Sequence, residues 1–339
     1  MKLSTVTGIK PNPKKYTASS SLILNRRYVG VEIEAENIRD SSVFNSLNLW
    51  SVTGDGSLRN GGIELISDTM RGADVEDALL EAERALSKNG AEFSPRTSVH
   101  VHLDMRAASV KELQALVILY TIFEKFFFKM GGDESREYNN HCRAVTSIQA
   151  IQRTFAYMLM DDRQQIQYGI NLWPKYMAFN VAPVATQGSV EFRHHVGTAQ
   201  QTEIIQWINI IFSLARAARR NAEQPLQELI DQVCAGPQDL FSRIFPRFRH
   251  LWEDDLIESM MEGARVIQYS LGLAELMMAE QRSQQDQLED MVPRGLDIPD
   301  VSDEDRRIPQ KARAQLRETR TRRIGTTVDW EVNPLGEDN

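Results

Sequence analysis

Cysteine is almost absent from this chain of 339 residues, which contains only Cys142 and Cys234. Two distant cysteines are too few for a disulfide framework or a thiolate zinc site, so a reducing compartment fits the sequence. Long apolar runs are absent as well. The basic first 27 residues lack the apolar segment of a signal peptide, and no later run is long enough to span a bilayer. These absences predict a soluble, cytoplasmic protein that does not enter the membrane.

Positive charge is in deficit, because 39 Lys and Arg residues face 47 Asp and Glu residues and give a net charge of -8. General nucleic-acid binding needs a basic surface, so nucleic acid is not an expected partner. Two nucleotide-binding motifs are also missing: no G-x-x-x-x-G-K-[ST] sequence occurs, and no G-x-G-x-x-G sequence follows a strand. A nucleotide bound to this protein would therefore have to lie on a sheet without either motif.

Changes in apolar pattern divide the chain into four parts. Residues 1–26 are rich in Lys, Ser, Thr and Pro and look like an N-terminal arm without a core pattern. Residues 27–220 mix short strand-like runs with amphipathic helices, which predicts an α+β catalytic domain. Residues 221–288 read as a helical extension, through which the chain could form homo-oligomers. Residues 289–339 lose their apolar content and predict a charged tail that is disordered or folds on a partner.

The clearest helix signal lies at residues 109–130. Ser109 is a suitable N-cap, Glu112 occupies the capping-box position, and the almost continuous apolar character predicts burial on most sides. Other helices are predicted at residues 73–90, about 145–160 and about 200–220.

The run YVGVEIEAENI, residues 28–38, alternates as a β-strand does, because successive strand side chains point to opposite faces. Its odd-numbered positions from 29 to 35 are apolar and predict a core face, whereas Glu32, Glu34 and Glu36 share the other face. A solvated surface strand is one interpretation. Glutamate is depleted in strands, however, and neighbouring like charges repel. A binding site becomes the better interpretation if adjacent strands carry ligand residues too.

Three further strand-like runs do carry such residues on one face. GGIELIS places Glu64 among apolar neighbours, SVHVHLD presents His100 and His102, and SVEFRHH presents Glu191 and Arg193. Each run alone fits a solvated face or a local ion pair, but together they predict a functional site on one sheet. Clustered carboxylates need cations, and oxygen ligands with few imidazoles suit Mg²⁺ or Mn²⁺ better than a closed zinc site. A guanidinium on the same face suits phosphate, so the pattern points to a nucleotide.

Two other local patterns have simpler interpretations. Cys142 follows His141, but adjacent residues rarely face each other and no third orienting group is evident, so we expect a structural thiol instead of a nucleophile. Asp55 and Ser57 in TGDGSL are expected as turn residues between glycines.

In their order along the chain, these pieces resemble the amidoligase family, carboxylate–amine ligases with the glutamine synthetase-like fold. GVEIEAE resembles the family's G-x-E-x-E strand, DGSL and GIELIS its D-x-S and E-x-x-S pieces, and SVHVHLD its H-x-H piece. SREYNNHC resembles a region with Arg, Tyr and Cys, although here Tyr138 and Cys142 are not adjacent. KYMAFN resembles an [RK]-Y-x-x-x-N piece and VEFRHH an E-F-R piece. The resemblance covers residues 28 to about 195.

The resemblance implies an antiparallel sheet with helices packed on one face and with ATP and divalent metals on its acidic face. It implies that a carboxylate is activated as an acyl phosphate and then attacked by an amine. By this analogy the metal ligands are Glu32, Glu34, Glu64, His100 and Glu191.

The same analogy assigns the remaining site residues. Arg193 would neutralise the phosphoryl group during transfer, and His102 would contact phosphate. Lys175 and Asn180, from KYMAFN, would bind the nucleotide, and Lys175 would also take part in catalysis. Lys175 stands where the family more often has Arg, which keeps the charge but loses the two-pronged contact.

The expected function is therefore an ATP- and Mg²⁺-dependent ligase that forms an amide or peptide-like bond between a small-molecule or peptide carboxylate and an amine. Two alternatives stay open. One is a metal-dependent hydrolase or phosphotransferase that uses the same Glu and His residues. The other is a catalytically inactive ligase-like binding module.

Overall fold

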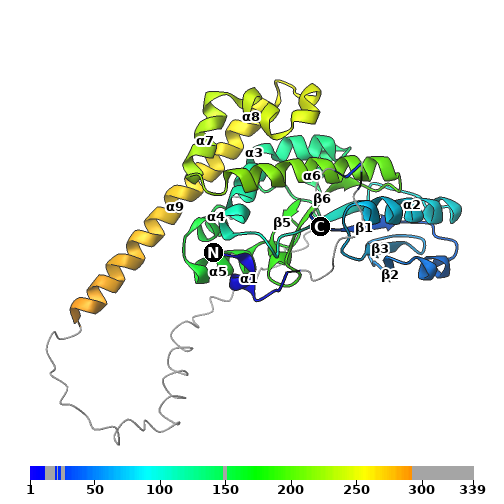
Figure 1. Ribbon diagram of the computed structural model, residues 1–339, viewed down its shortest axis with the longest axis horizontal. Coiled ribbons are helices and arrows are strands. Elements are labelled where there is room, and N and C mark those ends of the chain that lie inside the picture. Colours follow the sequence, from blue (N-terminus) through cyan, green and yellow to red (C-terminus); the bar gives the residue numbers. More distant parts are fainter. Residues whose placement is uncertain (12–19, 21, 24–26, 148–150, 292–339) are drawn as a thin grey trace, which may run out of the picture. The chain divides into compact units, whose positions relative to one another are not determined.

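A six-stranded antiparallel sheet forms the centre of the computed structural model, which describes residues 1–11, 20, 22–23, 27–147 and 151–291 (Figure 1). The strand order is β2-β3-β1-β4-β6-β5. The strands are β1 (Val29–Ala35), β2 (Trp50–Gly54), β3 (Ile63–Ser67), β4 (Ser98–Asp104), β5 (Phe179–Asn180) and β6 (Ser189–Val196). Residues 1–281 form one compact unit, and the sheet belongs to it.

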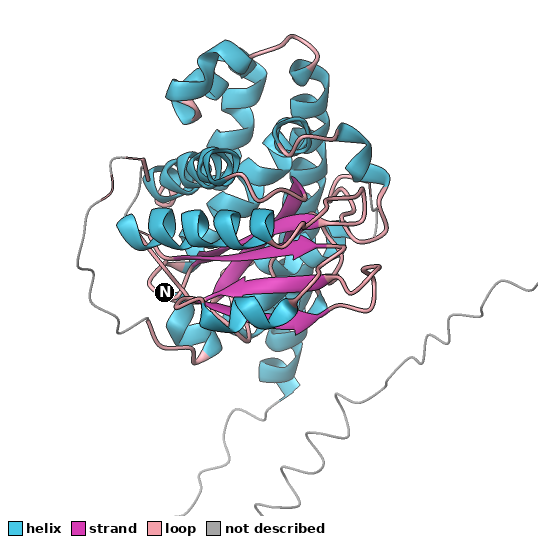
Figure 2. Ribbon diagram, turned by 90° about the vertical axis from the view of Figure 1, so that its right-hand side faces the viewer, coloured by secondary structure: helices cyan, strands magenta, loops and turns pink. Residues whose placement is uncertain are grey.

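Helices cover one face of this sheet, as Figure 2 shows. Helices α3 (Val110–Met130) and α6 (Gln201–Asn221) pack against β6 and β4, and α2 (Ala73–Lys88) packs beside α6. The others are α1 (Leu3–Thr7), α4 (Ile151–Leu159), α5 (Arg163–Leu172), α7 (Leu226–Ala235), α8 (Pro237–Ile244) and α9 (Leu256–Met291). Short 3₁₀ segments connect them at Ser41–Ser46, Glu134–Tyr138, Ala182–Val184 and Pro246–Leu251. The predicted α+β class, with an antiparallel sheet and helices on one face, is confirmed.

The alternation along β1 separates the core from the polar face. Val29, Val31 and Ile33 are fully buried on the side that the helices cover. Glu32 and Glu34 lie on the opposite side, because neighbouring strand residues point to opposite faces.

Helix α3 forms the centre of the helical layer. The Ser109 side chain caps it by accepting a hydrogen bond from the Glu112 backbone N–H at 3.0 Å, as the sequence predicts. The Glu112 carboxylate pairs with Arg27, so it does not complete a capping box. Phe126 and Phe127 of α3 are buried against aromatic side chains of β6 and α8.

The first residues of the chain pack against the core, although their composition shows no core pattern. Leu3 and Val6 of α1 are buried. The Leu3 backbone N–H donates to the carbonyl of Ala108 at 3.0 Å, and the Val110 N–H donates to the carbonyl of Met1 at 2.9 Å. Backbone pairing next to the start of α3 therefore holds a segment whose composition gave no core signal.

The sequence pattern did not predict one of the helices in the structure. The single helix expected near residues 145–160 is α4, and α5 follows it without having been predicted. Asp162 caps α5 by accepting from the Gln165 N–H at 2.9 Å, but few apolar residues mark the helix itself.

Helices α7, α8 and α9 provide the helical structure predicted for residues 221–288. The predicted charged tail begins in the last residues of α9 and otherwise lies outside the described residues. Within the described part of the chain, no helix has both the length and the apolar character needed to cross a bilayer.

Candidate metal and nucleotide site

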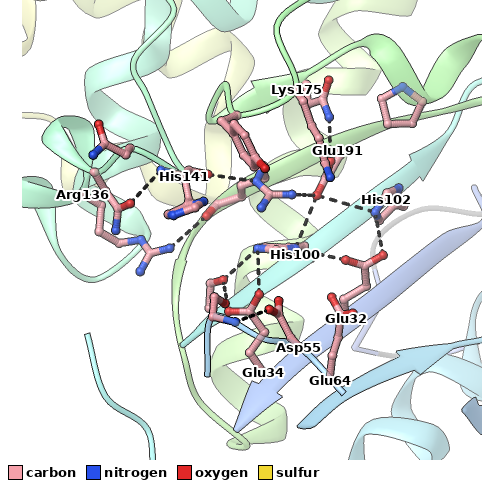
Figure 3. A pocket seen from close by; sticks show the side chains of 18 of the residues that line it. Glu32, Glu34, Asp55, Glu64, His100, His102, Arg136, His141, Lys175 and Glu191 are labelled. Carbon is pink, nitrogen blue, oxygen red and sulfur yellow. Dashed lines mark hydrogen bonds and ion pairs between the residues drawn. The ribbon is translucent and has the colours of Figure 1, made fainter. Parts of the chain in front are cut away.

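A cavity of about 920 Å³ opens on the polar face of the sheet (Figure 3). A space of this size can hold a nucleotide-sized ligand. All nine residues predicted for the site line this cavity: Glu32, Glu34, Glu64, His100, His102, Lys175, Asn180, Glu191 and Arg193.

The strand register brings these residues together. Across β1 and β3, Glu34 stands opposite Glu64, and across β1 and β4, Glu32 stands opposite His100. Across β4 and β6, His102 stands opposite Glu191. Directly opposed residues of antiparallel strands have neighbouring side chains. A band of ligand-type side chains therefore crosses the four central strands.

One group in this band consists of Glu32, His100 and Glu191. Each residue offers one ligand atom, and the three atoms lie within 4.8 Å of one another. The His100 Nδ1 atom is 3.1 Å from Glu32 Oε2 and 3.4 Å from Glu191 Oε1. Two carboxylates and one imidazole at this spacing fit a divalent ion such as Mg²⁺ or Mn²⁺.

A second group consists of Glu34, Glu64 and His100, whose ligand atoms also lie within 4.8 Å of one another. It uses the other side of the same imidazole, since His100 Nε2 is 3.9 Å from Glu34 Oε1. Figure 3 shows His100 between the carboxylates of Glu32 and Glu34. The two groups therefore share one ring, and each faces a different nitrogen of it.

Two carboxyl groups of the band, those of Glu32 and Glu64, differ in their ionisation. Burial alone would raise the pKa of Glu32, but hydrogen bonds from His100 and His102 hold it well below its usual range. Burial, together with the charges of Glu32 and Glu34, raises the pKa of Glu64 to about 8. In the metal-free protein, Glu32 is thus ionised at neutral pH while Glu64 mostly holds a proton.

Glu191 is the most constrained carboxylate of the site. Burial would raise its pKa, but the charges of His100 and Arg193 lower it. The Asn180 side-chain amide donates to Glu191 Oε2 at 2.9 Å, and the Arg193 guanidinium donates to Oε1. Asn180, predicted to bind the nucleotide, therefore orients Glu191.

Arg193 reaches over the cavity from β6, on the same face as Glu191, as the alternation predicted. Its Nε donates to the backbone carbonyl of His141 at 3.1 Å. Helix α3 anchors the loop that carries His141. The buried Glu124 of this helix accepts hydrogen bonds from the backbone N–H groups of Val145 at 2.6 Å and Thr146 at 2.9 Å. The guanidinium is therefore fixed on two sides.

His102 and Lys175 occupy different parts of the cavity. His102 Nε2 lies 3.1 Å from Glu32 Oε1, and its Nδ1 lies 3.1 Å from Ser189 Oγ. Burial would lower the pKa of His102, but the hydrogen bond with Glu32 and the charge of Glu191 raise it. Lys175 is exposed and lies over the ring of Tyr176, 5.4 Å from its centroid. Its ammonium group is available to a ligand that enters from solvent.

Glu36 does not line the cavity although it follows Glu32 and Glu34 on the strand pattern. Its buried carboxylate accepts from the Arg59 backbone N–H at 2.8 Å. This contact holds the β2–β3 connection, which carries Asp55 and Ser57 into the cavity wall. The two are turn residues, as predicted, because the Ser57 N–H donates to Asp55 Oδ1 at 2.7 Å.

Sequence reasoning missed several residues of the cavity wall. Arg96, Arg136 and His141 lie in connections between strands and helices, where no periodic pattern marks them. Arg136 is buried and donates to the carbonyl oxygens of Thr97 at 3.4 Å and Arg193 at 3.3 Å. These residues give the acidic site a basic wall.

Cys142 behaves as the structural thiol that the sequence predicts. It is 1% exposed, and its Sγ donates to the carbonyl of Arg193 at 3.4 Å. Burial raises the pKa of the thiol to about 11, which removes the thiolate that a nucleophile requires.

A comparison with known protein families identifies the family to which this chain belongs. Residues 25–215, more than half of the chain, match a family described as "Putative amidoligase enzyme". No curated protein matches the sequence. Among solved structures, a chain described as "Crystal structure of novel glutamine synthase homolog" is similar over 73% of this chain and 67% of that chain, with a TM-score of 0.34 and 8% identity. The chain belongs to the amidoligase family.

Proposed function

We propose that this protein is an ATP-dependent carboxylate–amine ligase that uses Mg²⁺ or Mn²⁺ and forms an amide or peptide-like bond through an acyl phosphate. The observation that carries the proposal is the convergence of Glu32, His100 and Glu191 beside the Arg193 guanidinium in one cavity. Metal ligands next to a fixed cation form a common arrangement for phosphoryl transfer.

The metal-binding part of the proposal rests on charge. Glu32 and Glu191 both have lowered pKa values and stay ionised, so they supply two negative oxygen ligands beside an imidazole. A bound divalent ion would neutralise these charges and the phosphate oxygens of a nucleotide. Glu34 and Glu64 offer a second group, whose occupation requires Glu64 to lose its proton.

The other residues act on the nucleotide and the acid substrate. Arg193 would stabilise the negative charge of the phosphoryl group as it passes to the carboxylate, because its guanidinium is fixed above Glu191 and cannot lose its charge. Lys175 and His102, which both line the cavity, would contact phosphate groups of the nucleotide. Asn180 keeps Glu191 in its ligating orientation.

ADP release tests the proposal. The purified protein is incubated with ATP, Mg²⁺ and mixtures of amino acids, short peptides and amines, and ADP, phosphate and new amide products are measured. We expect ADP only when a suitable carboxylate and amine are both present. Cleavage of esters or phosphates without ADP formation would instead indicate a metal-dependent hydrolase. Glu32→Gln and Glu191→Gln should abolish the activity, because each change removes a charged oxygen ligand. Thermal unfolding checks that each variant is folded, since neighbouring His and Arg side chains favour the charged form of both carboxylates.

A further inference from the structure

The two candidate metal groups share His100, so the orientation of its ring decides which group receives an imidazole ligand. Nδ1 faces Glu32 and Glu191, and Nε2 faces Glu34. A nitrogen binds a metal ion only through a free lone pair, and the hydrogen bond made by the other nitrogen sets which one is free.

Ser98 lies next to the Nε2 side of the ring. Its Oγ is 2.6 Å from Glu34 Oε2 and 2.7 Å from His100 Nε2, and its side chain is buried at 4% exposure. A serine hydroxyl has a single proton. In the contact with Glu34 the Ser98 hydroxyl is the donor, so this contact uses the Ser98 proton.

The contact between Ser98 and the imidazole then has one consistent assignment. Because the Ser98 proton points to Glu34, Ser98 Oγ accepts from His100, and the donor is Nε2–H. A protonated Nε2 cannot bind a metal ion. Nδ1, which hydrogen-bonds Glu32 Oε2 at 3.1 Å in the metal-free protein, is then the nitrogen through which the ring can bind an ion, because a metal ion between Glu32 and Glu191 can take the place of its proton.

We propose that Ser98 is a positioning residue that directs the metal-binding nitrogen of His100 to the Glu32–Glu191 group and withholds the ring from the Glu34–Glu64 group. The inference rests on the proposed use of a divalent ion. It predicts that the two groups differ in their affinity for a divalent ion. The group with His100 Nδ1 binds an ion first, and the group with Glu34 and Glu64 has carboxylate ligands only.

His102, on the same strand as His100, provides a matched control. Ser189 is also buried on the cavity face, and its Oγ contacts His102 Nδ1 at 3.1 Å. His102 belongs to neither three-residue group. Ser98→Ala and Ser189→Ala thus remove the same hydroxyl from two histidines, of which only one is assigned to the metal.

Mn²⁺ alone is the probe, titrated into the full-length protein without nucleotide and followed by calorimetry or by the loss of the free-ion EPR signal. We expect the Kd of the tightest site to rise by about tenfold to a hundredfold in Ser98→Ala, as is usual when a residue that orients a metal ligand is removed. Ser98→Thr, which keeps a hydroxyl and suits a strand, should bind almost as wild type does. Ser189→Ala should leave the Kd of this site unchanged.

Nitrogen NMR of the histidine side chains supplies a second readout in the Mg²⁺-loaded protein. His100→Asn identifies the His100 signals by their loss. We expect Nε2–H with an unprotonated Nδ1 for His100 in wild type, and loss of this single tautomer in Ser98→Ala. Thermal unfolding confirms that each variant is folded.

The outcomes separate two failures. If wild type shows no saturable Mn²⁺ binding, both the proposed metal-dependent function and the role of Ser98 are wrong. If wild type binds Mn²⁺ and Ser98→Ala binds it equally well, or if the loaded protein carries the proton on His100 Nδ1, only the role of Ser98 is wrong.

Discussion

Neighbouring carboxyl groups of the site have opposite ionisation, and Glu64 is the clearest case. It stands opposite Glu34 across β1 and β3, where burial and two carboxylate neighbours raise its pKa to about 8. Its ordinary value is 4.5. The folded metal-free protein therefore binds a proton there that the unfolded chain releases.

This proton makes the stability of the metal-free protein depend on pH. Between about pH 4.5 and pH 8 the unfolded state binds fewer protons at Glu64 than the folded state, so Glu64 costs stability as the pH rises. Glu64→Gln removes this cost. We expect the variant and wild type to be similar below pH 4.5, and the variant to be more stable by on the order of 1 kcal/mol at pH 8, since solvent screens a partly exposed group.

Chemical unfolding at several pH values, with a chelator present, measures this difference. Glu36→Gln is the control, because the Glu36 carboxylate accepts from the Arg59 N–H and lies outside the cavity. It should not gain stability with rising pH. A Glu64→Gln variant whose advantage is the same at pH 4 and pH 8 would contradict a raised pKa for Glu64.

Arg193 is the residue proposed to stabilise the phosphoryl group during its transfer. Arg193→Lys keeps one charge but loses the two-pronged contact and the bond from Nε to the His141 carbonyl. We expect kcat to fall by about a hundredfold or more, with a smaller change in ATP affinity, because the loss concerns the transition state. Steady-state kinetics on the substrate pair found by ADP release measures both constants.

Arg96→Lys is the matched control in the same cavity, since Arg96 is exposed and its guanidinium donates to the Ser57 carbonyl at 3.4 Å. It should change kcat little. If Arg193→Lys also kept a near-normal kcat, Arg193 would be a local ion-pair partner of Glu191 and would have no part in phosphoryl transfer.

At the scale of elements, α9 approaches α3 closely at Gly263. A Cβ at this position would lie 2.9 Å from the Cα of Ile122. At Gly272, in the same helix, a Cβ would have no heavy atom within 4 Å. Replacing glycine by alanine inside a helix normally stabilises it by about 0.5–1 kcal/mol.

The two substitutions should therefore have opposite signs. We expect Gly272→Ala to raise the free energy of unfolding by about 0.5–1 kcal/mol, and Gly263→Ala to lower it by about 1–3 kcal/mol, the usual cost of overpacking. Urea unfolding of both variants measures this. Equal stabilisation by both would mean that α9 does not pack tightly on α3.

The elements also show how far sequence reasoning could go. The period of two placed Glu32 with Glu34, His100 with His102, and Glu191 with Arg193, and each pair does share a face. Strand order and register do not follow from such a local pattern. That His100 stands between Glu32 and Glu191 depends on antiparallel pairing of β1 with β4 and of β4 with β6.

Other features had weaker signals or none. Glu36 fits the strand pattern, but the chain turns after β1 and its carboxylate holds a connection instead of a ligand. Arg136 and His141 enter the cavity from a connection held by Glu124, more than ten residues away in sequence. Ser98 is the first residue of a strand and has no local signal of a functional role. Only the folded structure brings it to Glu34.

On the scale of the whole molecule, the cavity and the main core lie within residues 1–281. Helix α9 contributes to that core through Leu256, Met260 and Ile267, which are all almost fully buried. The sequence after α9 contains few apolar residues and many charged ones. Removing these two segments should therefore have very different effects.

A chain ending before Arg306 should keep the thermal stability of the full-length protein, its Mn²⁺ affinity and its ADP-forming activity, because the deleted sequence has too little apolar content to add to the core. A chain ending before Leu256 should unfold at a clearly lower temperature or fail to fold, since each buried large aliphatic side chain contributes about 1.5–3 kcal/mol. Thermal unfolding and Mn²⁺ titration of both truncated chains test this. A chain cut before Arg306 that is stable and binds Mn²⁺ normally but forms no ADP would show that the tail supplies a group to the reaction.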